Sequence, residues 1–450
     1  MAHPSFSRIG FIMAAAGSAV GLGNVWKFPY ITGQYGGGAF VLVYLLTIFL
    51  IGFSVLVAEM YIGSRGKSDT VTSFEHLDPT PRKPWKYAGL MAFNGLLVMT
   101  FYSVVIGWIF HYIFLTLTQP LPTDIPTAQA NFTHLTTLEP FSQLFWHAIA
   151  TLIVVVVLYR GVKAGIERMN MIMMPSLIAI FVGLLLYSMQ FGEAFVRALE
   201  FMFYPDFSKL SSEAIVKAIG HAFFTLSIGM GAIMTYSAAL PHKNNITHAA
   251  FWVAFLDTAI ALIAGVLVFA FLFHFDQEPA VGPGLVFASM PVIFSQLGYI
   301  GTLLALLFFL ALSFAGLTSA VSLTEPSVEY LINRFGFSRL KAVAWSGLTY
   351  FGVGVLVLLS LVEGTDAWLK IGERSLFGFF EHITDAILLP FSGLLTALFI
   401  GYILPKNALR EHLEKEMGTK LYGVWRFSIR YIVPVALLFM LLNLTGIIVV

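Results

Sequence analysis

The chain has 450 residues, of which 58% are hydrophobic and only 11% are charged. Soluble domains carry about 25% charged residues, so this composition predicts an all-α protein that crosses a membrane several times. A net charge of +1 gives no indication of nucleic-acid binding. The lack of cysteine excludes disulfides, thiolate catalysis and cysteine-bound metal. Residues 1–7 carry no positive charge, which argues against a cleavable signal peptide.

Apolar runs of about 20 residues mark membrane-spanning helices. Eleven predicted spans follow one another at 8–31, 36–63, 87–117, 143–160, 166–189, 213–240, 247–274, 299–332, 340–362, 376–404 and 426–449. Most of the 25 Lys and Arg residues fall on the side of the N-terminus. This distribution predicts a cytoplasmic N-terminus and, with an odd number of spans, a C-terminus outside.

The loops add two outer segments, 118–142 and 275–298. The apolar run 286–294 in the second of them is too short to span, so we expect a re-entrant or capping hairpin there. The predicted organisation is a first repeat over 1–189, an outer loop over 190–212, a second repeat over 213–404, and an inner loop with the last span over 405–450.

The first span has a sequence that should not form an unbroken helix. Gly17, Gly21 and Gly23 each cost a helix about 1 kcal/mol relative to alanine, and the polar Asn24 and Lys27 follow. Lipid cannot satisfy freed backbone N–H and C=O groups, so a break at membrane depth must line a cavity or a protein interior. Such groups hold ions and small charged ligands. The alternative is that these glycines only allow close helix packing.

The sixth span is interrupted in a similar way by Gly229 and Gly231, with Thr225 and Ser227 beside the break. Spans one and six each begin a half of five helices, and interrupted helices at matching positions indicate a transporter binding site. A stripe of small and hydroxyl residues on one face of the eighth span offers oxygen atoms to a cation. Its members are Ala315, Thr318, Ser319 and Ser322. A hydrogen-bonded seam between helices is the alternative for this stripe.

Four stretches of the chain, 17–30, 36–40, 222–232 and 314–319, resemble helices one, two, six and eight of the neurotransmitter:sodium symporter family. The resemblance covers essentially the whole chain. Eleven helices and short termini are similar to the bacterial amino-acid branch, in particular to its transporters of several hydrophobic amino acids. The resemblance implies the LeuT fold, in which two inverted five-helix repeats (helices 1–5 and 6–10) have their first helices, 1 and 6, unwound at mid-membrane.

The same resemblance implies two sodium sites and a substrate site between the broken helices. Sodium site 1 would consist of Ala19, Asn24, Thr225 and Asp257 together with the substrate carboxylate. Sodium site 2 would consist of Gly17, Val20, Ala315, Thr318 and Ser319. The substrate would contact Ser18, Gly21, Leu22, Gly23, Val98, Tyr102, Phe224, Thr225, Ser227, Met230, Ser319, Ser322 and Leu323. The physics of helix ends supports these separate sodium and substrate sites. The C-terminal end of a helix has free carbonyl groups, which favour cations, and the N-terminal end has free N–H groups, which favour a carboxylate.

Further implied elements concern the two entrances. An outer gate would pair Lys27 with Asp385, closed by Phe224 and Tyr102. Gly165 and Pro175 match a motif in the fifth helix whose unwinding would open a water path for inner sodium release, with an ordinary proline kink as the alternative. The residues at the inner gate of the family, usually Arg and Asp, are Ala2 and Asn333 in this chain. We expect Glu59 and Glu325, near the inner ends of their helices, to make structural pairs.

Three departures from patterns in the family bear on the ions and the substrate. Asp257 stands where the family usually has Asn, and a carboxylate in the middle of a membrane is costly enough to imply a function. Tyr44 and Thr225 match the chloride site of animal members, whereas His221 and Ala261 do not, so we expect transport without chloride. Gly21 replaces the carboxylate of amine transporters, which favours an amino acid as the substrate.

The sequence therefore predicts a sodium-coupled symporter that imports aliphatic and aromatic L-amino acids by alternating access across a bacterial inner membrane. No cofactor other than Na⁺, no nucleic acid and no obligatory protein partner is expected. The alternatives are a narrower substrate, such as tyrosine or tryptophan, and a sensor that binds without transporting. A channel fits paired broken helices less well. An enzyme is disfavoured because the motifs HExxH and GxSxG are absent.

Overall fold

The computed structural model of the protein describes residues 6–240, 245–277 and 282–444. Within these ranges nine helical stretches are long and apolar enough to cross a membrane. They are Gly38–Gly66, Pro84–Thr118, Pro140–Tyr159, Val162–Phe191, Ile246–His274, Gly298–Phe335, Arg339–Leu359, Leu376–Ile403 and Lys406–Asn443. Each overlaps a predicted span, so the all-α membrane architecture is confirmed.

Two further predicted spans are broken. Arg8–Ala19 and Gly23–Gln34 form one bent span with an angle of 49° between its halves. The sixth predicted span consists of α11 (Ser212–Thr225) and α12 (Ala232–Ala238), separated by the non-helical residues 226–231. The two helices that the sequence predicts to unwind are therefore the two that are interrupted in this way.

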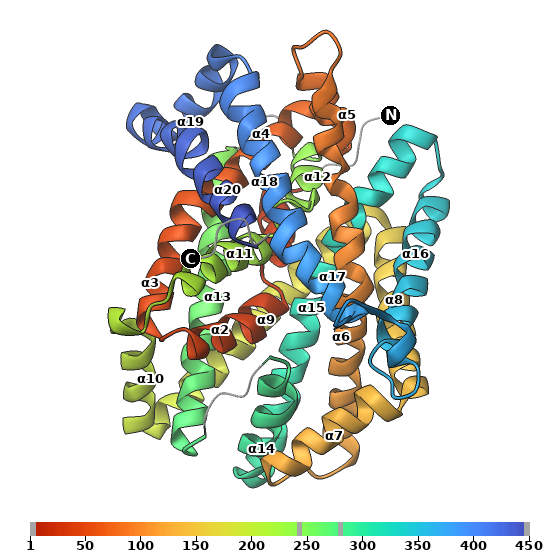
Figure 1. Ribbon diagram of the computed structural model, residues 1–450, viewed down its shortest axis with the longest axis vertical. Coiled ribbons are helices and arrows are strands. Elements are labelled where there is room, and N and C mark those ends of the chain that lie inside the picture. Colours follow the sequence, from red (N-terminus) through yellow and green to blue (C-terminus); the bar gives the residue numbers. More distant parts are fainter. Residues whose placement is uncertain (1–5, 241–244, 278–281, 445–450) are drawn as a thin grey trace.

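The remaining helices follow the chain in the order shown in Figure 1. The first half contains α1 (Arg8–Ala19), α2 (Phe28–Gln34), α3 (Gly38–Thr47), α4 (Phe53–Gly66), α5 (Thr70–Leu77), α6 (Ala92–Thr118), α7 (Ile125–Leu138), α8 (Pro140–Tyr159), α9 (Arg168–Ser188) and α10 (Glu193–Phe203). After α11 and α12 come α13 (Ile246–His274), α14 (Met290–Ser295), α15 (Gly298–Phe335), α16 (Arg339–Leu359), α17 (Leu376–Ile383), α18 (Leu389–Leu398), α19 (Lys406–Phe427) and α20 (Val433–Leu444). A short antiparallel pair, β1 (Lys370–Ile371) and β2 (Arg374–Ser375), precedes α17.

π-Helical segments join several of these helices into longer spans. They are Gly23–Lys27, Ile48–Gly52, Val162–Glu167, Leu285–Ser289, Thr384–Leu388, Phe399–Ile403 and Ser428–Ile432. Such segments often mark functional positions in a helix. The last span differs from its prediction, because helical structure already begins at Lys406 and turns at Gly418, whose φ is 77°. The predicted residues 445–449 of that span lie outside the described ranges.

The two outer segments predicted from the sequence lie together. Figure 1 shows α7 and α14 at one end of the molecule and α5 and α19 at the other. The apolar run in 275–298 forms Leu285–Ser295, which is too short to span and is buried, with Phe287 stacked on Phe132 of α7. It therefore covers this end of the bundle as one short helical stretch, and residues 278–281 of the segment lie outside the described ranges.

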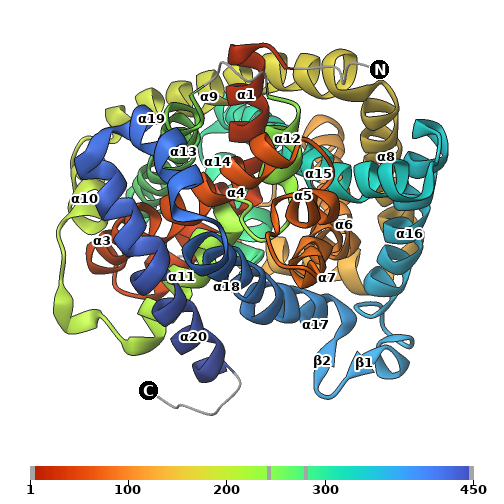
Figure 2. The same ribbon diagram turned by 90° about the horizontal axis from the view of Figure 1, so that it is seen from above.

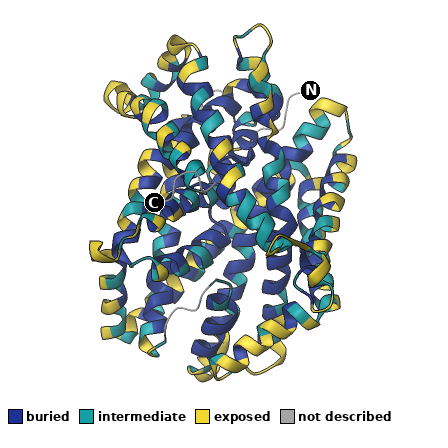
Figure 3. Ribbon diagram, viewed as in Figure 1, coloured by how far each residue is buried: buried dark blue, intermediate teal, exposed yellow. Residues whose placement is uncertain are grey.

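The residues of both breaks are buried, from Ala14 to Val25 in the first and from Thr225 to Ser237 in the second. Seen from above, α4, α12 and α15 lie inside an outer set of helices that includes α8, α10, α16 and α20 (Figure 2). Burial follows the same plan, since buried residues fill the centre and exposed residues cover the periphery and both ends (Figure 3). The freed backbone groups of α1 and of residues 226–231 are thus surrounded by protein, which meets the requirement set by the lipid.

Candidate functional site

The break after α1 is stabilised by its own polar residue. The helix ends at Ala19, and Val20 turns the chain into an extended conformation with ψ 97°. The side chain of Asn24 reaches back, and its Oδ1 accepts a hydrogen bond of 2.9 Å from the N–H of Gly21. Asn24 is fully buried. The asparagine predicted from the sequence to bind an ion is therefore also the residue that caps the unwound backbone.

The break in the sixth span depends on left-handed backbone at Ser227, Gly229 and Gly231, with φ values of 52°, 77° and 75°. Side chains rarely tolerate this region, so Ser227 carries strain that is typical of functional sites. Its Oγ donates a hydrogen bond of 2.7 Å to the carbonyl of Ser18 and so joins the two breaks. Ser18 Oγ itself has no hydrogen-bond partner among the described residues.

Glu59 holds the second break, which corrects the sequence prediction for this residue. We expected a structural pair near the inner end of its helix. Instead Glu59 is fully buried, and its Oε1 accepts a hydrogen bond of 2.8 Å from the N–H of Gly229. The carbonyl of Gly229 in turn accepts a bond of 2.8 Å from Asn94 Nδ2. Asn94 is not among the residues predicted from the sequence, although a lone amide side chain in an apolar span points to a buried polar contact.

The first predicted ion site brings its side chains together around Asp257 of α13. Asp257 Oδ1 accepts hydrogen bonds from Asn24 Nδ2 at 2.7 Å and from Thr225 Oγ1 at 2.9 Å. Asp257 is fully buried, and its Oδ2 has no hydrogen-bond partner among the described residues. Ala19 lines the small cavity beside this cluster. A carboxylate oxygen without a donor at the centre of a membrane protein is unfavourable unless a cation neutralises it.

The second predicted ion site gathers oxygen atoms between α1 and α15. Ser319 Oγ lies 3.2 Å from the carbonyl oxygen of Gly17 and 3.4 Å from that of Val20. Thr318 Oγ1 lies 3.1 Å from the carbonyl oxygen of Ala315. All five predicted residues are buried. Hydroxyl and carbonyl oxygens without a nearby carboxylate form a cluster that suits a hard, singly charged cation.

The predicted substrate residues surround a small cavity between the two breaks. It is lined by Ser18, Ala19, Gly21, Gly23, Val98, Tyr102, Phe224, Thr225, Ser227, Met230, Ser319 and Leu323. Leu22 and Ser322 lie next to it, since the N–H of Leu22 donates to Tyr102 Oη at 3.1 Å and Ser322 Oγ donates to the Ser319 carbonyl at 2.8 Å. The cavity holds about 10 Å³, the space of one water molecule, so a ligand larger than water fits there only when side chains move.

Gly21 lines this cavity where two hydroxyl groups approach its backbone closely. A Cβ atom there would lie 2.7 Å from Ser319 Oγ and 3.0 Å from Tyr102 Oη. Any side chain would therefore displace the hydroxyls that line the site. This close approach explains why glycine stands at this position, independently of the family comparison.

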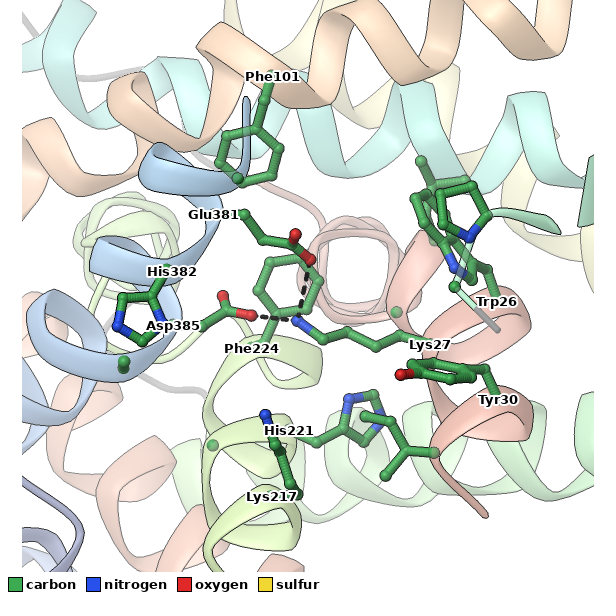
Figure 4. Close-up of a pocket in the computed structure, with 18 of the residues that line it drawn as sticks. Trp26, Lys27, Tyr30, Phe101, Lys217, His221, Phe224, Glu381, His382 and Asp385 are labelled. Carbon is green, nitrogen blue, oxygen red and sulfur yellow. Dashed lines mark hydrogen bonds and ion pairs between the residues drawn. The ribbon is translucent and has the colours of Figure 1, made fainter. Parts of the chain in front are cut away.

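A larger cavity of about 550 Å³ lies beyond Tyr102 and Phe224, which line both cavities and separate them. Lys27 extends across it and pairs with Asp385, as predicted, with its Nζ 4.7 Å from the centre of the Phe224 ring (Figure 4). Glu381 is a second carboxylate, 3.7 Å from Lys27 Nζ. Glu381 is not among the gate residues predicted from the sequence, although it stands four residues before Asp385, a spacing that places two residues on one face of a helix.

The residues at the positions of the family's chloride site form no ion pair in the part of the chain that the structure describes. His221 is buried, with its ring centroid 5.4 Å from that of Tyr44, and neither ring nitrogen has a partner among the described residues. Ala261 is also buried.

Of the two residues at the predicted inner gate, Ala2 lies outside the described ranges, and Asn333 Nδ2 is 3.4 Å from Ser68 Oγ. Glu325 makes the pair predicted for it, a two-bond contact of 2.8 Å with Arg339. Gly165 lies in the π-helical segment Val162–Glu167 and Pro175 lies inside α9, so the fifth helix is wound in this structure.

Comparisons with known proteins agree with this arrangement. The family model described as the sodium:neurotransmitter symporter family matches residues 5–143 and 128–448. The uncharacterized sodium-dependent transporter YhdH of Bacillus subtilis is 36% identical over 446 residues, with 98% of this chain and 97% of that protein covered. A sodium-dependent transporter of Haemophilus influenzae is 31% identical over 443 residues, with 96% of each chain covered.

A solved structure shows the same fold. The crystal structure of MhsT in complex with L-phenylalanine superposes with a TM-score of 0.90 at 39% identity, covering 99% of this chain and all of MhsT. Members of the matching family are transporters, which confirms that the chain is not an enzyme. With paired broken helices, oxygen clusters beside them and this similarity over nearly its whole length, the chain belongs to the sodium:neurotransmitter symporter family, as a sodium-dependent symporter of the membrane.

Proposed function

We propose that the protein imports hydrophobic L-amino acids together with Na⁺, using two sodium sites and alternating access. The observation that carries this proposal is Asp257, a fully buried carboxylate with one oxygen free of hydrogen bonds among the described residues. Na⁺ bound there would neutralise it and would also contact the substrate carboxylate. Each ligand would then raise the affinity for the other, which is thermodynamic coupling.

The lining of the small cavity supports the substrate class. Its side-chain end is formed by Val98, Phe224, Met230 and Leu323, which carry no charge. The flexible Met230 adapts its shape to different apolar groups. L-Phenylalanine bound to MhsT agrees with an amino acid of this kind. We therefore propose that the site accepts amino acids with side chains from branched aliphatic to aromatic, and that it is not restricted to tyrosine or tryptophan.

Uptake by purified protein in liposomes tests the proposal. With Na⁺ outside and none inside, we expect labelled L-leucine to accumulate and both unlabelled L-leucine and L-tryptophan to compete. Failure of both amino acids to compete would contradict the substrate class. Sodium-dependent binding without accumulation or counterflow would favour the sensor over the transporter.

The two carboxylates beside Lys27 at the proposed outer gate should contribute unequally to uptake. Asp385 is 19% exposed and in direct contact with Lys27, whereas Glu381 is 41% exposed and 3.7 Å away. An exposed ion pair contributes about 0–1 kcal/mol, whereas removing one partner of a buried pair costs more, because it leaves the other charge uncompensated. Asp385→Asn should therefore reduce the rate of uptake several times more than Glu381→Gln, and Lys27→Arg should retain uptake. Equal losses in the two carboxylate variants would contradict this order.

Chloride should be dispensable, because Asp257 already supplies a fixed negative charge near the first sodium site. We expect initial rates of uptake to be the same in sodium chloride and in sodium gluconate. The control is replacement of Na⁺ by choline at constant chloride, which should abolish uptake. A loss in gluconate as large as the loss in choline would overturn the expectation.

The proposed location is the bacterial inner membrane, with the N-terminus in the cytoplasm and the C-terminus outside. Support comes from the Lys and Arg distribution along the sequence. The grouping of α5 and α19 at one end and of α7 and α14 at the other agrees with that topology (Figure 1). Labelling of single cysteines introduced into the native cysteine-free chain would test it directly.

A further inference from the structure

The start of the fifth helix presents two polar side chains to α1. Glu167 and Asn170, three residues apart, face two glycines of α1 that are two turns apart. A Cβ atom at Gly10 would lie 2.2 Å from Glu167 Oε1, and one at Gly17 would lie 2.0 Å from Asn170 Oδ1. Side-chain oxygens of the fifth helix therefore lie directly against the backbone of α1, in spaces that only glycine leaves open.

Asn170 is fully buried, and its amide oxygen lacks a hydrogen-bond donor among the described residues. Its Nδ2 donates a bond of 2.9 Å to the carbonyl of Ile166. This bond fixes the orientation of the amide, because exchanging the two atoms would bring two acceptor oxygens together. The free oxygen is thus the atom directed at Gly17. Leaving a buried acceptor unsatisfied costs about 1–3 kcal/mol, which indicates a ligand at another stage of the cycle.

This free oxygen lies next to the second oxygen cluster. Gly17, which it contacts, contributes to that cluster through its carbonyl, 3.2 Å from Ser319 Oγ. The fifth helix packs against both α1 and α15, the two helices that form the cluster. An oxygen atom of Asn170 is therefore available immediately beside the proposed sodium site 2, but outside its set of ligands.

Glu167 continues this line of oxygens toward the start of α1. Its carboxylate accepts bonds from the N–H of Ser7 at 3.3 and 3.4 Å, and it contacts Ser7 Oγ as well. Glu167 is 9% exposed, so it lies at the border between the packed interior and solvent. From the second oxygen cluster toward the start of α1, the oxygen atoms are thus first backbone carbonyls, then the amide oxygen of Asn170, and last the carboxylate of Glu167. The negative charge lies at the end of this series.

We infer that Asn170 Oδ1 and the Glu167 carboxylate form a transient site that takes Na⁺ from sodium site 2 toward the inner side. The inference rests on the proposed function, since it concerns the ion of that site. Na⁺ prefers oxygen ligands, and successive weak sites let an ion leave a stronger one in steps. When the ion reaches Glu167, the carboxylate exchanges Ser7 for the ion, which frees the start of α1.

Substitutions at Asn170 test this site with two measurements. Asn170→Leu keeps the volume and removes the oxygen, whereas Asn170→Asp keeps an oxygen and adds charge. A hydrogen-bond-like contact to a charged group is worth about 1.5–3 kcal/mol, so Asn170→Leu should slow uptake into liposomes about tenfold or more. The sodium concentration for half-maximal L-leucine binding in detergent should stay at the wild-type value. The matched control is Ser176→Ala, a half-buried position on α9 whose hydroxyl donates to the carbonyl of Ile172 one turn earlier, which should change neither quantity.

Asn170→Asp provides the second, independent readout. We expect uptake to persist at zero internal Na⁺ and to become more sensitive to Na⁺ placed inside the liposomes, because a carboxylate retains the departing ion. Wild-type uptake and unchanged internal-sodium sensitivity in both variants would overturn the inference. Equal losses in binding and in turnover would also overturn it, since they would assign Asn170 to sodium site 2 or to the fold. Absence of sodium-driven uptake in the wild type would instead refute the proposed function, and this inference with it.

Discussion

Asp257→Ala is expected to abolish sodium-driven uptake. The variant leaves Asn24 Nδ2 and Thr225 Oγ1 without their shared acceptor and removes the negative charge from the buried cluster. Removing one partner of a buried charge pair costs about 3–5 kcal/mol, which corresponds to a loss of sodium affinity of more than about a hundredfold. The measurement is the initial rate of L-leucine uptake as a function of external Na⁺.

A thermal-melting series separates ion binding from folding. Ligand at about a hundred times its dissociation constant stabilises a protein by about 2.7 kcal/mol, so Na⁺ should raise the melting temperature of the wild type. In Asp257→Ala, Na⁺ should raise the melting temperature less than in the wild type, because sodium site 1 no longer contributes. Asp257→Asn keeps an oxygen atom, so the sodium-dependent rise should be reduced less. Asp366→Ala removes a carboxylate outside the buried clusters that pairs with Lys370, and it serves as the control. A full sodium response in Asp257→Ala would contradict the assignment.

Gly229→Ala is expected to remove transport through the backbone alone. Gly229 has φ 77°, and a Cβ atom there would lie 2.7 Å from the carbonyl oxygen of Leu389. The methyl group cannot rotate away, so either α18 or the residues 226–231 must shift, and overpacking of this kind costs about 1–3 kcal/mol. The shift would also disturb the hydrogen bonds of Gly229 to Glu59 and Asn94. We therefore expect lost uptake and a lower melting temperature.

Gly183→Ala is the matched control for that experiment. Gly183 lies inside α9 with no atom within 4 Å of an added Cβ. Alanine there should be neutral or raise the stability by up to about 1 kcal/mol, because it favours the helix. If both substitutions left uptake and melting unchanged, residues 226–231 would not need the conformation seen here.

Much of the fold follows from local features of the sequence. Apolar runs of sufficient length must be helical in a membrane, and glycine clusters at Gly17–Gly23 and Gly229–Gly231 weaken a helix wherever it packs. Both predicted breaks are present, and the short apolar run 286–294 forms a buried cap. Resemblance to the family supplied the candidate ligands, and at each predicted ion site several of them are joined by hydrogen bonds in the structure.

Side-chain partners across the bundle were decided only by the tertiary structure. The sequence placed Glu59 near an inner end and gave it a structural pair, whereas packing directs it to the N–H of Gly229. Glu381 beside Lys27 and the free oxygen of Asn170 against Gly17 were not predicted at all. The length and breaks of a helix are set by its own residues. Which face meets which neighbour depends on the rotation and depth of every helix, and those are fixed only when the whole bundle packs.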